Sequence, residues 1–272
     1  MRISGLARST FFYHQARQDR QDKFALVKEQ ILVANQKARG RYGHRRIHHE
    51  LMKLGYRVAK KTVLALMRVL GIRCRVRARR KYSSYQGLAG RIAPNVLDRD
   101  FHANKPDQKW VTDVTQFQLA GQRLYLSPII DLYDHSVIAH SISTAPTTAF
   151  TNESLLKAMA TRHDTGELIV HTDQGFHYQH LSWRTILAAN HATQSMSRKG
   201  NCYDNSLAEN FFGHLKSELF LDGMPATRSE LEAEIEDYIT WYNNERIQER
   251  LKGMTPNQYR NHALQHRTTT TI

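Results

Sequence analysis

Cysteine and long apolar runs are both scarce in this chain of 272 residues. Its two cysteines, Cys74 and Cys202, stand far apart without a CxxC pair, so neither a disulfide framework nor a zinc finger is indicated despite fifteen histidines. No stretch approaches the roughly eighteen apolar residues of a membrane helix, and the N-terminal residues MRISGLARST lack the apolar segment of a signal peptide. We therefore expect a cytoplasmic protein with no membrane partner.

Acidic residues are also scarce in the first part of the chain. Residues 1–97 hold 23 lysines and arginines against 4 acidic residues, whereas residues 98–272 hold 16 against 21. A basic balance of this size suits the phosphate backbone of nucleic acid, which releases counterions when a cationic protein binds. A merely soluble basic domain is the alternative interpretation. The two parts of the chain are expected to have different roles.

The basic part is predicted to be helical. An imperfect apolar stripe begins near Lys23, and two short helices ending at Gly55 and Gly71 follow as a helix-turn-helix-like pair, giving a DNA-binding domain over residues 23–71. Residues 1–22 resemble the second half of a further helix-turn-helix whose beginning is missing. Four cations lie off the apolar positions and are candidates for phosphate contacts, with a plain charged surface as the alternative: Arg45, Arg46, Lys60 and Lys61.

Residues 72–97 are predicted to be a basic linker. Basic residues alternate there with small apolar ones before the sequence becomes rich in serine, tyrosine and glycine. An arm that follows the DNA backbone explains this pattern better than a strand, although alternation is also typical of strands. The candidate DNA contacts in the linker are Arg73, Arg75, Arg77, Arg79, Arg80 and Lys81.

Short apolar runs replace the basic pattern from Trp110 onward. The runs WVTDVTQF, RLYLSPIIDLY and HSVIAHSIS predict three successive antiparallel strands, and a helix, a strand ELIVHTD, a second helix, a short strand ATQSMS and a third helix follow. This order predicts an α/β fold over residues 98–222, with a mixed five-stranded sheet and flanking helices. Residues 223–272 are predicted to form a helical tail that packs on this core.

Three carboxylates fall at informative places in the predicted core. Asp113 has the strand parity of Val111 and Phe117, so it points where a core residue is expected and needs a partner. Asp173 ends the fourth strand, at the edge where α/β sheets bind ligands, and we expect the first and fourth strands to be neighbours. Glu209 lies on the last helix, on a polar line beside an apolar stripe. The alternatives are structural ion pairing and, for Glu209, a solvated helix face.

Several motifs in order resemble one known family. They are YGHRRIHHEL and GYRVAKKTV in the basic part, then WVTDVT, HTDQGFHY, SMSRKGNCYDNSLAENFF, LKSEL and YNNERIQERLKGMTPNQY. Together they resemble the retroviral-integrase-like transposases of bacterial insertion elements of the insertion element three family, and 35 residues separate Asp173 from Glu209. The resemblance implies an RNase H-like core with Asp113, Asp173 and Glu209 as its catalytic, metal-binding triad. It also implies that an upstream reading frame supplies a partner, joined to this chain by translational frameshifting.

The implied chemistry is metal-dependent DNA cleavage at the ends of the element, followed by strand transfer of the 3′-hydroxyl. Two magnesium ions, for which manganese can substitute, would be held by carboxylate oxygens and would assist the attacking and leaving oxygens. The implied partners are double-stranded DNA, as terminal repeats and as target, and further copies of the chain on that DNA. A sequence-specific DNA-binding regulator and an RNase H-like nuclease without strand transfer are the rival functions.

Other residues of the core are candidates for supporting roles. Gly175 is expected to let the DNA backbone approach, or else to serve as a plain turn. Asp131 and Asp134 are rival carboxylates, expected to cap turns. The remaining candidate DNA contacts are Arg198 and Lys199 before the last core helix, Lys216 on the polar line of Glu209, and Arg246, which resembles a family position.

Overall fold

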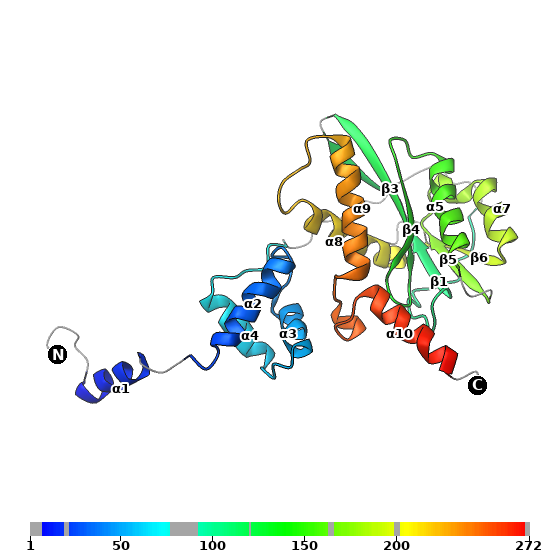
Figure 1. The fold of residues 1–272 in the computed structure, drawn as a ribbon. Helices are drawn as coiled ribbons and strands as arrows, with labels where there is room; N and C mark the ends of the chain where they lie inside the picture. The colour runs from blue at the N-terminus through cyan, green and yellow to red at the C-terminus, as the bar shows by residue number, and fades with distance from the viewer. Residues whose placement is uncertain are drawn as a thin grey trace. The chain divides into compact units, whose positions relative to one another are not determined.

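The computed structural model describes residues 7–18, 22–76, 92–119, 121–162, 166–198 and 202–269, and the chain divides into two units, residues 1–75 and 76–272 (Figure 1). Among the described helices, none combines the length and the apolar character that crossing a bilayer requires.

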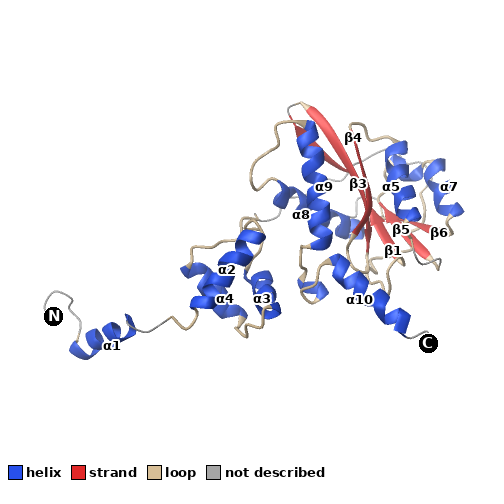
Figure 2. Cartoon of the chain, viewed as in Figure 1, coloured by secondary structure: helices blue, strands red, loops and turns tan. Residues whose placement is uncertain are grey.

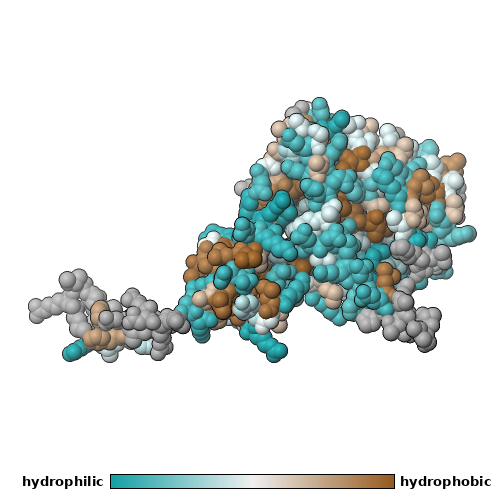
Figure 3. Space-filling model, viewed as in Figure 1, coloured by the Kyte–Doolittle hydropathy of each residue, from teal (hydrophilic) through white to brown (hydrophobic). Residues whose placement is uncertain are grey.

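The first unit is a helical one. Its elements are α1 (Arg8–Gln18), α2 (Ala25–Lys37), α3 (His44–Lys53) and α4 (Lys60–Val69) (Figure 2). Helices α2, α3 and α4 contact one another around a small core, in which Ile31, Ile47, Leu51 and Val63 are fully buried. Brown patches in Figure 3 show that apolar side chains stay on the surface of this unit. The exposed apolar residues of the unit include Leu26, Leu32, Val33, Met52, Leu54 and Val69.

Both predicted helix ends in this unit are confirmed. Gly55 follows α3 with φ of 85° and Gly71 follows α4 with φ of 69°, in the left-handed region that glycine adopts without steric cost. The N–H of Tyr56 donates to the Leu51 carbonyl at 3.0 Å, and the N–H of Ile72 donates to the Met67 carbonyl at 2.8 Å. These bonds satisfy the last carbonyls of each helix and turn the chain away.

The second unit is a mixed α/β structure. Its sheet has the order β2-β3-β1-β5-β6, and β4 pairs with β3. Its strands are β1 (Lys109–Thr112), β2 (Thr115–Leu119), β3 (Gln122–Asp131), β4 (Val137–Ser143), β5 (Leu168–Thr172) and β6 (Ala192–Met196). Its helices are α5 (Thr148–Ala160), α6 (Phe176–Gln179), α7 (Leu181–Ala189), α8 (Ser206–Leu219), α9 (Arg228–Asn244) and α10 (Pro256–Thr269), with short helices η1 (Cys202–Asn205) and η2 (Glu249–Leu251).

The first predicted strand is two strands in the structure. Both β1 and β2 pair antiparallel with β3, but the chain leaves the ladder between them, at Asp113 and Val114. The Val114 N–H donates to the Asp113 carboxylate at 2.7 Å, a local bond that competes with strand pairing. The expectation of five strands is therefore wrong, since the described part of the chain contains six.

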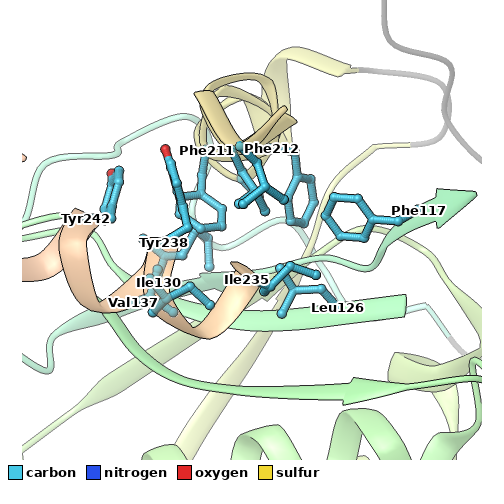
Figure 4. Packing of buried hydrophobic residues seen from close by; sticks show 14 of the residues in the cluster. Phe117, Leu126, Ile130, Val137, Phe211, Phe212, Ile235, Tyr238 and Tyr242 are labelled. Atoms are coloured by element: carbon cyan, nitrogen blue, oxygen red, sulfur yellow. The ribbon is translucent and has the colours of Figure 1, made fainter. Parts of the chain in front are cut away.

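Two apolar cores cover the two faces of the sheet. On one face α5 and α7 pack against Trp110, Ile129 and Val170. On the other face α8 and α9 pack against the sheet, and Figure 4 shows Phe211 and Phe212 of α8 above its strands. The predicted apolar stripe of α8 is confirmed, because Ala208, Phe211, Phe212, Leu215 and Leu219 are buried and its sixth member, Leu207, is partly buried.

The predicted linker is too long at both ends. The Arg75 N–H donates to the Gly40 carbonyl at 3.0 Å, so residues up to this point belong to the helical unit. In the second unit the Met196 N–H donates to the Pro94 carbonyl at 3.2 Å, and Leu97 is buried. Apolar contact with the sheet therefore begins before residue 98, and residues 77–91 between the two units lie outside the described part of the chain.

Candidate active site

Asp113 and Asp173 lie at the same level of two neighbouring strands. Strands β1 and β5 are parallel and pair Lys109 with Ile169 and Val111 with His171, a constant offset of 60 residues. The same offset separates Asp113 from Asp173, and each aspartate follows its strand directly. Neighbouring strands lie about 4.8 Å apart, so the two carboxylates start from adjacent backbone positions. The expectation that the first and fourth strands are neighbours is confirmed.

The turn after β5 is built around the Asp173 carboxylate. Its Oδ1 accepts a hydrogen bond from the Gly175 N–H at 2.8 Å. Burial raises the pKa of Asp173, and the Gly175 bond lowers it in part. A Cβ atom at Gly175 would lie 2.9 Å from this oxygen and 3.5 Å from the Tyr178 ring. The glycine therefore makes room for the protein's own carboxylate, a reason that neither alternative of the sequence analysis included. Approach of the DNA backbone at this turn stays a prediction.

Asp113 lies on the side of the sheet that faces α8. The aspartate is 5% exposed, and its charge raises the pKa of Lys216 on α8 while burial, the larger effect, lowers it. The Lys216 ammonium also lies 5.4 Å from the centre of the Phe117 ring. Lys216 is thus placed beside the aspartate, as its position on the polar line of α8 suggests.

Glu209 is half-buried on α8, two helical turns before Lys216. Burial raises the pKa of its carboxyl group, so the ionised form lacks compensation. The three carboxylates offer the hard oxygen donors that divalent magnesium prefers. A bound cation would favour the ionised form of Glu209, which burial disfavours. In the described residues, however, no three His, Cys, Asp or Glu side chains are close enough together to hold one ion. The structure brings the two aspartates together and leaves Glu209 on the neighbouring helix.

A buried ion pair that the sequence did not reveal fixes the far side of α8. Glu218 accepts hydrogen bonds from Arg246 at 2.8 and 2.7 Å and from the Tyr238 hydroxyl at 3.0 Å. The prediction that Arg246 contacts DNA is wrong, because its side chain is 2% exposed and paired with Glu218. Glu218 stands nine residues after Glu209, so it lies on the opposite side of α8 from Glu209. A buried carboxylate at position 218 could therefore have been expected. Its partner could not, because Arg246 comes from beyond α9.

The loop before α8 is organised by a second residue that sequence reasoning missed, Asp204. This carboxylate is fully buried and pairs with Arg198 at 2.8 Å and with Arg99 at 2.8 Å. The hydrogen bond from Arg198 and, to a smaller extent, the one from Arg99 hold the pKa of Asp204 well below its usual range. Arg198 was predicted to bind DNA, but two of its guanidinium nitrogens are engaged by Asp204. Lys199, the neighbouring candidate, lies outside the described residues.

The rival carboxylates Asp131 and Asp134 have a structural role. Each caps a turn, by accepting from the N–H groups of Tyr133 and Ser136 respectively. Both also bind Arg260 of α10, which joins the C-terminal helix to the sheet. Burial, with the neighbouring Asp134 charge, raises the pKa of Asp131 to about 7.

The DNA contacts proposed for the helical part remain predictions. Arg45, Lys60 and Lys61 are exposed, and the Arg46 guanidinium lies 5.4 Å from the centre of the Tyr42 ring. In the predicted linker, Arg73 and Arg75 are exposed. The other linker candidates lie outside the described residues: Arg77, Arg79, Arg80 and Lys81.

Comparison with known proteins identifies both units. Residues 103–202 and 209–264 match two family models described as an integrase core domain, and residues 21–81 match an HTH-like domain. The chain is also similar to a cryoEM structure of the simian T-cell lymphotropic virus intasome in complex with PP2A regulatory subunit B56 gamma. That match has a TM-score of 0.50 at 18% identity and covers 75% of this chain and 67% of that one, which shows the fold.

Sequence similarity to transposases shows the family of the chain. The chain is 42% identical over 261 residues to the putative transposase InsK for insertion sequence element IS150 of Escherichia coli, covering 96% of this chain and 92% of that protein. It is 35% identical over 237 residues to the transposase InsF for insertion sequence IS3A of the same bacterium, covering 86% and 82%. The chain therefore belongs to the IS3 family of insertion-element transposases, which are DDE-type polynucleotidyl transferases with an RNase H-like integrase core after an HTH-like domain.

Proposed function

We propose that this transposase cuts phosphodiester bonds at the ends of its own insertion element and joins the freed 3′-hydroxyl to a second phosphodiester. Asp113, Asp173 and Glu209 are the proposed catalytic triad. The observation that supports this assignment is the matched level of Asp113 and Asp173 on β1 and β5, on the side of the sheet that faces the helix of Glu209. No protein nucleophile is needed, because water attacks first and the DNA hydroxyl attacks second.

Transposases and integrases of this class generally use divalent metal ions. For this chain we propose two magnesium ions, replaceable by manganese, with the three carboxylates as protein ligands. When bound, such ions activate the attacking oxygen and stabilise the leaving oxygen of an in-line displacement. The chain contributes two aspartates fixed by the sheet and one glutamate carried by α8. Lys216, beside Asp113, is proposed to contact a DNA phosphate near the reacting bond.

Members of the family bind DNA and act as oligomers. The proposed DNA is double-stranded, as the terminal repeats of the element and as the target. The proposed phosphate contacts are Arg45, Arg46, Lys60 and Lys61 of the helical unit and the linker cations. Two further partners follow from the family resemblance: a second copy of the chain on the DNA, and the upstream reading-frame product, joined as a frameshift fusion. A bacterial cytoplasmic protein, associated with the nucleoid when bound to DNA, fits these partners.

A strand-transfer assay tests the proposed function. The protein is incubated with a labelled duplex that carries the element end, an unlabelled target duplex and magnesium chloride. We expect shortened products that carry a new 3′ end and longer products in which labelled and target strands are joined. A DNA-binding regulator would give neither product, and a nuclease without strand transfer would give only the shortened one. Either outcome would contradict the proposal.

A further inference from the structure

Three hydroxyl groups are buried together beneath the two aspartates, and none of them has a hydrogen-bond partner outside this group. They belong to Thr112, Ser127 and Tyr178, whose residues are 0%, 0% and 1% exposed. An unpaired buried polar group costs about 1 to 3 kcal/mol. Phenylalanine at position 178 would keep the ring packing without that cost. The Tyr178 hydroxyl therefore has a role that packing does not explain.

The strand register places these hydroxyls on one face of the sheet. Thr112 lies opposite Ile129 in the pairing of β1 with β3, and Ser127 comes two residues before Ile129 on β3. The side chains of Thr112 and Ser127 therefore lie on the same face of the sheet as that of Ile129. Tyr178 belongs to the apolar core of that face, and its ring meets the Trp183 ring edge-on at 4.9 Å between centres. Thr112 directly precedes Asp113. The hydroxyls thus gather under the ends of the strands that carry the aspartates.

Tyr178 is also tied to the turn that holds Asp173. Gly175 donates to the Asp173 carboxylate, and a Cβ atom on this glycine would lie within 3.6 Å of two Tyr178 ring atoms. Burial raises the pKa of Tyr178, and the charges of Asp113 and Asp173 raise it further, whereas the Thr112 and Ser127 hydroxyls lower it. The phenol therefore keeps its proton, and both carboxylates act on it.

We propose that Tyr178 is a positioning residue for the two aspartates: its hydroxyl donates a hydrogen bond to the carboxylate pair of Asp113 and Asp173 when they hold a divalent cation. This inference rests on the proposed metal-binding role of these aspartates. The Thr112 and Ser127 hydroxyls act on the phenol oxygen and lower its pKa, which leaves the proton of the phenol for the carboxylates. A hydrogen bond to a metal ligand from outside fixes which carboxylate oxygen faces the ion, and losing such a bond typically weakens metal affinity 10- to 100-fold.

The matched pair of variants Tyr178→Phe and Tyr238→Phe separates this role from packing. Each removes one hydroxyl from a buried tyrosine ring, but the Tyr238 hydroxyl donates to Glu218 on the far side of α8. The full chain of each variant is titrated with manganese chloride by calorimetry and unfolded with urea. For Tyr178→Phe we expect at least a tenfold loss of manganese affinity with unchanged or higher stability. For Tyr238→Phe we expect lower stability with unchanged manganese affinity.

The Asp113→Asn variant, titrated in parallel, distinguishes the possible failures. If Asp113→Asn loses manganese affinity and Tyr178→Phe keeps that of the wild type, the positioning role is overturned while the proposed metal site stands. If Asp113→Asn binds manganese as the wild type does, the proposed metal site itself is wrong, and the role of Tyr178 fails with it. Equal losses of stability and no loss of affinity in both tyrosine variants would show that the Tyr178 hydroxyl only supports packing.

Discussion

Asp113 and Asp173 each stand one residue past the end of a strand, and the ladder between β1 and β5 sets them side by side. Their spacing is thus fixed by backbone hydrogen bonds rather than by flexible side chains. Burial raises the pKa of Asp173 and so disfavours its ionised form. A bound cation offsets this penalty, so the arrangement suits a metal-dependent enzyme.

Removal of one carboxylate charge at a time is expected to stop the chemistry and to spare DNA binding. The variants Asp113→Asn, Asp173→Asn and Glu209→Gln should each lose cleavage and strand transfer, because a metal ligand is lost while the cationic surface is unchanged. Gel assays of both products, with duplex affinity measured beside them, check this. Glu153→Gln on α5 changes an exposed carboxylate and is the control. Near-wild-type activity in any triad variant would remove that residue from the site.

Gly175→Ala should lower activity far more than stability. The added Cβ atom would lie 2.9 Å from Asp173 Oδ1, so the carboxylate must move, and a side-chain end moves at little cost to the fold. Gly175 has φ of −61°, which alanine adopts freely, and the reduced freedom of the unfolded chain offsets some of the strain. We expect a free energy of unfolding within about 1 kcal/mol of wild type. Unchanged strand transfer would show that Asp173 tolerates displacement.

Breaking the buried pair on α8 should destabilise the second unit strongly. Arg246→Met leaves the Glu218 carboxylate buried without its guanidinium partner, and loss of one member of such a pair costs about 3 to 5 kcal/mol. The double variant Glu218→Leu with Arg246→Met removes both charges and should recover most of that loss. Urea unfolding of the wild type and both variants measures the two effects. If the double variant is no more stable than Arg246→Met, the pair does more than neutralise charge.

His171 should make stability depend on pH. Its ring lies in the sheet, bonded to the Ser195 hydroxyl at 2.9 Å, and burial lowers the pKa of His171 to about 4 while the nearby Asp204 raises it slightly. The unfolded chain takes up this proton near pH 6.5, but the folded chain only near pH 4. Stability from this residue is therefore complete above pH 6.5 and is lost as pH falls toward 4, by up to about 3 kcal/mol.

The comparison for His171 uses His171→Gln and, at an exposed position, His102→Gln. Unfolding free energies are measured by urea at pH 7 and near pH 4. The wild type should lose more stability than His171→Gln over this interval, and about as much as His102→Gln. If the wild type and the His171→Gln variant lose the same unfolding free energy between pH 7 and pH 4, the folded wild type takes up a proton on His171 as readily as the unfolded chain does.

Much of the fold could be predicted because local signals agreed with the packing. Glycines at positions 55 and 71 ended helices where left-handed turns were needed, and the 3.6-residue spacing of α8 marked its buried face. The neighbouring placement of Asp113 and Asp173 followed from strand order and from the end of each strand. By contrast, the break after Asp113 was not visible, because the run WVTDVTQF keeps the alternation of a single strand on both sides of it.

Long-range charge pairing was the part that the sequence did not reveal. Arg246 and Arg198 each looked like a free surface cation, but Arg246 is buried against Glu218, and Arg198, although exposed, is engaged by the buried Asp204. Which carboxylate meets which guanidinium depends on the folded path of the loop before α8 and of the chain after α9, and sequence spacing does not reveal it. The structural role of Gly175 could not be predicted for a similar reason, since only the folded turn shows that Asp173 and Tyr178 occupy the space beside it.

Residues 92–97, near the start of the second unit, affect the solubility of this unit. Strand β6 is the last strand on its side of the sheet, and an uncovered edge strand offers unpaired backbone groups to other chains. Residues 92–97 cover it: Pro94 accepts from the Met196 N–H, and the Leu97 N–H donates to the Ser195 hydroxyl at 3.0 Å. A catalytic fragment begun at residue 98 would expose this edge and would be prone to edge-to-edge aggregation, whereas one begun at residue 92 would carry its own cover.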